Sequence, residues 1–190
     1  MKLSEKELLR RRGRTLRKGL ENSAALSGKI CERIMDWNVF TASRRIMSYC
    51  PIDGEADIRE VNNAAVSAGE LFLPAVVREA GRLLIEARRF FEEAVCVNGK
   101  YGISEPPQGA PVIRPEDIEL IFVPGIMFAP SGERIGFGRG YYDRFLVSCT
   151  RAVKAGVCFE AQIEKDFQTH VNDVKMDFVI TEVGIYKGEK

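Results

Sequence analysis

The stretch from residue 132 to residue 144, GERIGFGRGYYDR, constrains the fold of this chain more than any other segment. An apolar run at residues 120–123 precedes it, and the pattern from residue 141 onward predicts a helix directly after it. A strand, a glycine loop and a helix in this order build a phosphate-binding site. Glycines let backbone N–H groups turn toward an anion, and the N-terminus of the following helix adds partial positive charge.

Charged side chains in the same stretch favour the same chemistry. Arg134 and Arg139 supply forked donors that match phosphate oxygens, and Asp143 offers a carboxylate of the kind that joins Mg²⁺ to nucleotide phosphates. The stretch does not match the P-loop, which needs Lys-Ser or Lys-Thr, nor the dinucleotide fingerprint, because Tyr141 stands where its third glycine belongs. From the residues alone we predict phosphate binding and no particular reaction, with a tight structural turn as the alternative.

The composition is that of an ordinary globular protein. Of its 190 residues, 45% are hydrophobic and 29% charged, so we expect residues 1–190 to form a single domain with a full core. A net charge of +1 favours neither nucleic acid nor an anionic membrane as a partner. We expect a monomer or a weak homodimer that acts on a small molecule.

The cysteines and the apolar runs indicate where such a protein works. No apolar run is long enough to span a bilayer, and the first residues lack the apolar core of a signal peptide. The five cysteines are scattered without a C-x-x-C pair, which argues against a disulfide framework and against a structural zinc site. These features predict reduced thiols and a cytoplasmic location.

Strands and helices alternate along the chain, which predicts an α/β fold with a mostly parallel sheet flanked by helices. Helices are expected over residues 4–37 with a break at 21–23, over 56–68, and over 141–149. Strands are expected at residues 45–49, 71–73, 83–87, 120–123, 155–159 and 178–181, with Pro74 ending the second and no strand after the last. The proline-rich residues 98–115 predict a long loop, and the glycine loop follows the carboxyl end of the central strand, where open α/β sheets bind ligands.

Longer motifs, spread over nearly the whole chain, resemble those of one family in order and spacing. They are Val123-Pro124-Gly125-Ile126-Met127-Phe128; the stretch from Gly132 to Tyr141-Tyr142-Asp143-Arg144; Tyr49-x-Pro51-x-x-Gly54-Glu55-x-Asp57; Leu73-Pro74; Tyr101-Gly102-Ile103-x-Glu105-Pro106; Asp173-x-x-x-Asp177; and Ile180-Thr181-Glu182. Together they resemble the 5-formyltetrahydrofolate cyclo-ligases, also called 5,10-methenyltetrahydrofolate synthetases.

The resemblance implies both a fold and a reaction. The fold is a three-layer α/β arrangement similar to that of the ribose-phosphate isomerase and CoA-transferase group. The reaction uses ATP and Mg²⁺ to cyclise a reduced folate, 5-formyltetrahydrofolate, to 5,10-methenyltetrahydrofolate, and it releases ADP and phosphate. The γ-phosphoryl group passes to the formyl oxygen, and N10 then attacks the activated carbon. Such chemistry needs positioning and charge neutralisation but no covalent nucleophile.

Residue roles are implied where the motifs match. The resemblance assigns ATP binding to Lys6, Arg10, Arg134, Gly136, Gly138, Arg139, Gly140 and Tyr141. It assigns catalysis to Arg134, Arg139 and Tyr142, metal binding to Asp143 and Asp173, and folate binding to Glu55 and Tyr101. Structural roles are the alternatives for three of these: a turn or helix cap for Asp173, a solvent-facing turn for Glu55, and loop packing for Tyr101.

The chain departs from the family pattern before the glycine loop. Ala129 stands where the family commonly has an aspartate, so a non-catalytic folate- or nucleotide-binding protein is one alternative function. A same-fold enzyme with another acyl or phosphorylated substrate is the other. On the N-terminal helix, Lys6 with Arg10 keeps the family's four-residue spacing of lysine and arginine. The alternative register selects Arg12, with Leu8 at the lysine position.

Overall fold

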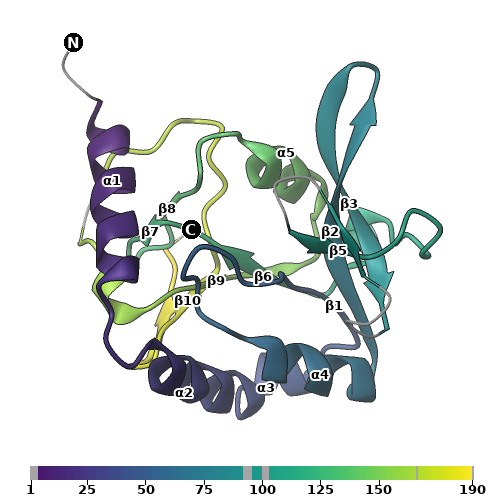
Figure 1. The fold of residues 1–190 in the computed structure, drawn as a ribbon, viewed down its shortest axis with the longest axis horizontal. Helices are drawn as coiled ribbons and strands as arrows, with labels where there is room; N and C mark the ends of the chain where they lie inside the picture. Colours follow the sequence, from purple (N-terminus) through teal and green to yellow (C-terminus); the bar gives the residue numbers. More distant parts are fainter. Residues whose placement is uncertain (1–3, 92–95, 100–102, 166, 190) are drawn as a thin grey trace.

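The computed structural model describes residues 4–91, 96–99, 103–165 and 167–189 (Figure 1). The helices are α1 (Glu5–Lys18), α2 (Ser23–Met35), α3 (Asn38–Ala42), α4 (Arg59–Ala68) and α5 (Tyr141–Ser148), with the 3-10 helices η3 (Pro115–Asp117) and η4 (Glu160–Gln162). The strands are β1 (Arg45–Met47), β2 (Glu70–Glu79), β3 (Arg82–Phe90), β4 (Val97–Asn98), β5 (Ser104–Glu105), β6 (Leu120–Pro124), β7 (Met127–Phe128), β8 (Arg134–Ile135), β9 (Val153–Val157), β10 (Phe178–Ile180) and β11 (Ile185–Lys187). Among the helices of these described residues, none combines the length and apolar character needed to cross a membrane.

Seven of the strands form one sheet, in the order β11-β10-β9-β6-β1-β2-β3. The inner pairings are parallel, whereas the β2–β3 and β10–β11 pairings at the two edges are antiparallel. Helices α2, α3 and α4 cover one face of the sheet, and α5 lies on the other (Figure 1). The prediction of a mostly parallel sheet flanked by helices is therefore confirmed.

β6 lies at the centre of the sheet and is buried along its whole length, as the sequence predicts. Leu120 and Phe122 belong to the core on the side of α2, α3 and α4. Ile121 and Val123 belong to the core on the side of α5. A central parallel strand is apolar on both faces because helices cover both, and its carboxyl end leads into the segment that carries the glycine loop.

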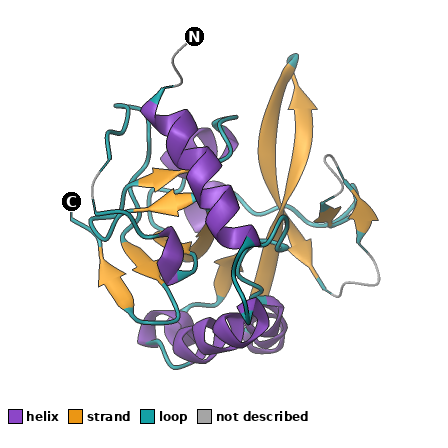
Figure 2. Cartoon of the chain, turned by 60° about the vertical axis from the view of Figure 1, so that its left-hand side comes forward, coloured by secondary structure: helices purple, strands orange, loops and turns teal. Residues whose placement is uncertain are grey.

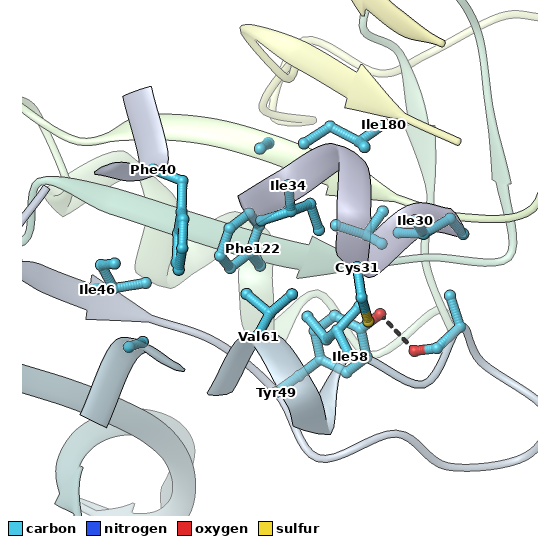
Figure 3. Close-up of a cluster of buried hydrophobic side chains, with 14 of the residues drawn as sticks. Ile30, Cys31, Ile34, Phe40, Ile46, Tyr49, Ile58, Val61, Phe122 and Ile180 are labelled. Carbon is cyan, nitrogen blue, oxygen red and sulfur yellow. Dashed lines mark hydrogen bonds between the residues drawn. The ribbon is translucent and has the colours of Figure 1, made fainter. Parts of the chain in front are cut away.

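The core on the side of α2 contains a buried tyrosine, Tyr49 (Figure 3). Ile30 and Ile34 of α2 pack in the same cluster as Phe122 of β6. Tyr49 is buried beside them, and its hydroxyl donates a hydrogen bond to the Ala56 carbonyl at 2.8 Å. That bond satisfies the phenol inside an apolar core and fixes the segment that follows β1.

β2 does not end at Pro74, as the sequence led us to expect, but continues as a long antiparallel hairpin with β3. Val76 donates its backbone N–H to the Glu105 carboxylate at 3.3 Å, on the side of β2 away from β3. Pro74, two residues earlier, faces the same way. The N–H that proline lacks is therefore not needed by the β2–β3 ladder, and the strand tolerates it.

Other boundaries also differ from the expected ones. α4 begins at Arg59, three residues late, because Asp57 donates its N–H to the Ser27 hydroxyl at 3.0 Å before the helix starts. β9 lies two residues earlier than expected, and residues 98–115 contain the short strand β5. β10 is not the last strand, because β11 follows it and pairs antiparallel at the edge of the sheet.

The break between the first two helices falls where the sequence predicts it. Ser4 and Glu7 form a capping box at the start of α1, in which each side chain accepts the backbone N–H of the other residue. α1 ends at Lys18, and Asn22, with a left-handed φ of 62°, precedes α2. Asparagine tolerates this conformation better than most residues, so it suits the corner.

α1 lies against the hairpin β7–β8 and the 3-10 helix η4 (Figure 2). Leu9 and Leu16 pack on a small apolar cluster that contains Ile126 and Met127. Gly13 lies between them and is buried. A Cβ atom at this position would lie 2.6 Å from the Ile126 carbonyl oxygen and 2.8 Å from the Met127 sulfur. Glycine therefore sets how closely α1 approaches the hairpin.

We expect Gly13→Ala to lower the free energy of unfolding by about 1–3 kcal/mol, because the added methyl group overpacks the contact with Ile126. Gly28→Ala in α2 is the matched control. An added Cβ there meets nothing within 4 Å, so we expect a gain of about 0.5–1 kcal/mol. Urea unfolding measures both changes. Equal stability of Gly13→Ala and the parent protein would contradict the close approach of α1.

Candidate active site

A cavity of about 690 Å³ lies beside the carboxyl ends of β1 and β6. Its walls come from α1, the segment after β1, the hairpin β2–β3, the glycine loop and the start of α5. Every predicted site residue that the structure describes lines it: Lys6, Arg10, Glu55, Arg134, Gly136, Gly138, Arg139, Gly140, Tyr141, Tyr142, Asp143 and Asp173. Tyr101 lies outside the described residues. The structure thus brings these residues together, while their individual roles stay predictions.

The glycine loop, residues 136–140, wraps around an arginine of α1. Arg10 donates from Nε to the Gly136 carbonyl at 3.0 Å. Gly138 has a φ of 95°, and a Cβ there would lie 3.3 Å from the Arg10 guanidinium carbon. Gly140, with a φ of 63°, turns the chain into α5 and offers no side chain to cap that helix. Among the described residues no side chain caps α5, and the N-terminus of this helix, with its partial positive charge, lies at the cavity.

Three cations of α1 line the cavity at four-residue spacing: Lys6, Arg10 and Arg14. The sequence prediction missed Arg14, although its spacing from Arg10 places it on the same helix face. Arg12, which the alternative register selects, forms an ion pair with Glu164 and does not line the cavity. The geometry therefore favours the register of Lys6 and Arg10.

Two carboxylates of the cavity form ion pairs with cations of the same cavity. Arg134 donates from Nη2 to Asp143 at 2.7 Å, and Lys6 donates to Asp173 at 2.5 Å. Asp173 also accepts the His170 N–H at 2.7 Å, so it closes a turn as well as facing the cavity. Burial raises the pKa of Asp173, but the hydrogen bonds from Lys6 and His170 outweigh it, and this pKa lies below its usual value.

The carboxylates suit a magnesium ion that a phosphate helps to bind. In the part of the chain that the structure describes, no group of three or more His, Cys, Asp and Glu side chains is placed to hold a metal. Mg²⁺ commonly binds through one or two carboxylates together with substrate phosphates. Asp143 and Asp173 face the same cavity as the glycine loop, so the donor set fits Mg²⁺ when phosphate oxygens complete its coordination.

Glu55 is a buried carboxylate that lines the same cavity. Its side chain is 5% exposed, so the alternative of a solvent-facing turn residue is wrong. Oε2 accepts the Ile52 N–H at 3.1 Å, whereas Oε1 has no hydrogen-bond partner among the described residues. Burial raises the pKa of Glu55 to about 7, against the opposing effect of the Arg17 guanidinium 3.6 Å away.

Part of the cavity wall is apolar and aromatic. Pro74, Val76 and Ile85 of the hairpin β2–β3 line it, and Tyr142 lies beneath the Arg134 guanidinium, 5.7 Å from its ring centroid. The sequence did not predict this wall, because the strand at residues 71–73 was expected to end at Pro74. Burial and the charge of Glu55 raise the pKa of Tyr142, so its phenol stays protonated.

Ala129, the departure from the family pattern, does not line the cavity. It is buried in the apolar cluster of Ile126, Met127 and Ile135 beneath α1. Its backbone N–H donates to the Glu133 carbonyl at 3.0 Å within the hairpin β7–β8. In this chain the position is therefore part of the packing that supports the site.

Comparison with known proteins settles the family. The model of the 5-formyltetrahydrofolate cyclo-ligase family matches residues 2–182. The chain belongs to this family. The family resemblance read from the motifs is thereby confirmed over nearly the whole chain.

Individual members of the family agree with this chain over most of its length. The 5-formyltetrahydrofolate cyclo-ligase of Saccharomyces cerevisiae is 26% identical over 204 residues, which cover 94% of this chain and 95% of that protein. The solution structure of the 5,10-methenyltetrahydrofolate synthetase of Aquifex aeolicus has a TM-score of 0.85 at 30% identity, covering 97% of this chain and 93% of that one. A synthetase of Mycoplasma pneumoniae, with a TM-score of 0.73 at 23% identity over 94% and 99% of the two chains, shares the fold.

The buried carboxylate of Glu55 gives the stability of the protein a pH dependence. Its pKa is about 7 in the folded protein, above the usual 4.5, so its contribution to stability is lost as the pH rises through this range. We expect Glu55→Gln to remove that loss and to gain free energy of unfolding relative to the parent between about pH 5 and pH 8, on the order of a few kcal/mol. Urea unfolding at several pH values measures the gain.

The control for this prediction is Glu21→Gln, which changes an exposed carboxylate outside the cavity. We expect this variant to follow the parent protein at every pH. If the free energy of unfolding of Glu55→Gln also matches that of the parent at every pH, burial does not disfavour the charged form of Glu55.

Proposed function

We propose that this chain closes 5-formyltetrahydrofolate into 5,10-methenyltetrahydrofolate, using ATP and Mg²⁺ and releasing ADP and phosphate. One observation carries the proposal: a single cavity joins a cationic, glycine-rich wall to a buried carboxylate, one oxygen of which accepts no hydrogen bond from the described residues. The first feature suits a polyphosphate, and the second suits the N–H edge of a pterin. Membership of the cyclo-ligase family supports both assignments.

The cationic wall suits the triphosphate of ATP. Lys6, Arg10 and Arg14 follow one face of α1, and Arg139 lies on the glycine loop of the same cavity. Glycines in that loop let phosphate oxygens approach backbone N–H groups, and α5 begins directly after it. Asp143 and Asp173 would hold Mg²⁺, which supplies charge neutralisation for the phosphate oxygens when it is bound.

The reaction follows from the weakness of a formamide oxygen as a leaving group. Transfer of the γ-phosphoryl group of ATP to that oxygen forms an iminium phosphate and leaves ADP. N10 of the folate then attacks the formyl carbon, loses its proton, and the C–O bond breaks to release phosphate. No covalent nucleophile is required, so the task of the protein is positioning and charge neutralisation. Arg134 and Arg139 supply the charge, and the protonated Tyr142 supplies a hydrogen-bond donor.

The buried carboxylate and the apolar wall suit the folate. The edge of a pterin carries neighbouring N–H groups that a carboxylate accepts in parallel. Oε1 of Glu55 accepts no hydrogen bond from the described residues, and Oε2 keeps acceptor capacity beyond its bond from Ile52. The side chains of Pro74, Val76 and Ile85 provide the apolar surface on which the rings pack. Because Ala129 lies outside the cavity, its lack of a carboxylate does not favour a non-catalytic role.

We expect the purified protein to form 5,10-methenyltetrahydrofolate from 5-formyltetrahydrofolate, ATP and Mg²⁺, with one ADP for each product. The rise in methenyl absorbance and the ADP released measure this directly. Chelation of Mg²⁺ should stop the reaction, because Asp143 and Asp173 would then face the phosphates with no metal ion between them. Binding of the folate without any product would instead favour a non-catalytic binding protein.

A further inference from the structure

We propose that Arg17 is a positioning residue of this site, which favours the charged form of the Glu55 carboxylate and keeps it available to the folate without touching the folate itself. The inference rests on the proposed function, because it assigns Glu55 to folate binding. Arg17 does not line the cavity. It lies behind Glu55, and none of the sequence motifs singled it out.

Arg17 is a buried cation held by one turn. Its side chain is 0% exposed. Nη2 donates to Asp53 at 3.3 Å, and Nη1 lies 3.6 Å from Oε1 of Glu55. Nε and Nη1 have no hydrogen-bond partner among the described residues. Burying a guanidinium costs free energy. The charges of the Asp53 and Glu55 carboxylates offset part of that cost.

The local backbone brings Arg17 against two walls of the cavity. Asp53 and Gly54 have positive φ values of 50° and 76°, and this turn directs Glu55 inward. A Cβ at Gly54 would lie 3.8 Å from the Cβ of Arg17, so the turn rests on the last turn of α1. The Arg17 guanidinium also lies over the ring of Phe137 in the glycine loop, 5.5 Å from its centroid. One side chain thus lies against both Glu55, which we assign to the folate, and the glycine loop, which we assign to the phosphates.

The effect on Glu55 is electrostatic, because the 3.6 Å separation is longer than a hydrogen bond. Asp53 from the same turn and the phenols of Tyr49 and Tyr142 are the other titratable groups that act on or near Glu55. Burial pushes the pKa of Glu55 up, Arg17 pulls it down, and Asp53 pushes it up. Arg17 is therefore the cation that opposes protonation of this carboxylate at neutral pH.

The test is the affinity for 5-formyltetrahydrofolate, measured by calorimetry without ATP from acid to alkaline pH. In the parent protein we expect affinity to rise with pH around the Glu55 pKa of about 7. Arg17→Met should move that midpoint upward by about one pH unit or more, because it removes an opposite charge near the carboxylate. Arg17→Lys keeps the charge, so its midpoint should lie close to that of the parent protein. Asp53→Asn should move the midpoint downward, because it removes a like charge.

A double variant separates positioning from plain structural support. Glu55→Gln should abolish the pH dependence of folate affinity, and adding Arg17→Met to it should cause no further loss. If Arg17→Met lowers affinity equally at all pH values, or if its loss persists beside Glu55→Gln, the inference is wrong. Arg17→Lys and Asp53→Asn carry the test if Arg17→Met does not fold. If the parent protein does not bind 5-formyltetrahydrofolate at all, the proposed function itself fails.

Discussion

The cavity depends on one close contact, that of α1 with the hairpin β7–β8 at Gly13. No side chain separates the two there, so α1 lies low enough for Arg10 to reach the Gly136 carbonyl and for Lys6 to reach Asp173. The last turn of the same helix places Arg17 behind Glu55. One helix thus supports the glycine loop, Asp173 and Glu55, and any change in its position affects all three together.

Two ion pairs join cations and carboxylates that line the same cavity. Arg134 pairs with Asp143, and Lys6 pairs with Asp173. Such pairing holds each side chain in place and avoids isolated charges in a partly buried site. A polyphosphate with a divalent cation offers new partners to both members of each pair. Its phosphate oxygens suit the two cations, and its metal ion suits the two carboxylates. The site therefore needs an exchange of partners on binding, with little change in its own charge.

The sequence predicted the parts of the structure that local patterns determine. The apolar run of β6, the glycine loop and the start of α5 all lie where expected, because each depends on residues close together in the chain. The predicted end of β2 was wrong, because a proline is tolerated where it faces away from the neighbouring strand, and that side is fixed only by the pairing of β2 with β3. Arg17 was missed for a similar reason: its importance comes from a turn 36 residues away, to which no spacing along α1 points.

The most direct test of this account follows the formyl oxygen through the reaction. 5-Formyltetrahydrofolate labelled with ¹⁸O in the formyl group is converted with ATP and Mg²⁺, and the phosphate released is examined by ³¹P NMR. If the cavity brings the γ-phosphoryl group onto the formyl oxygen, each product molecule formed leaves one ¹⁸O atom in the phosphate. Phosphate that carries only oxygen from ATP and water would contradict the account, because ATP would then be hydrolysed apart from the folate.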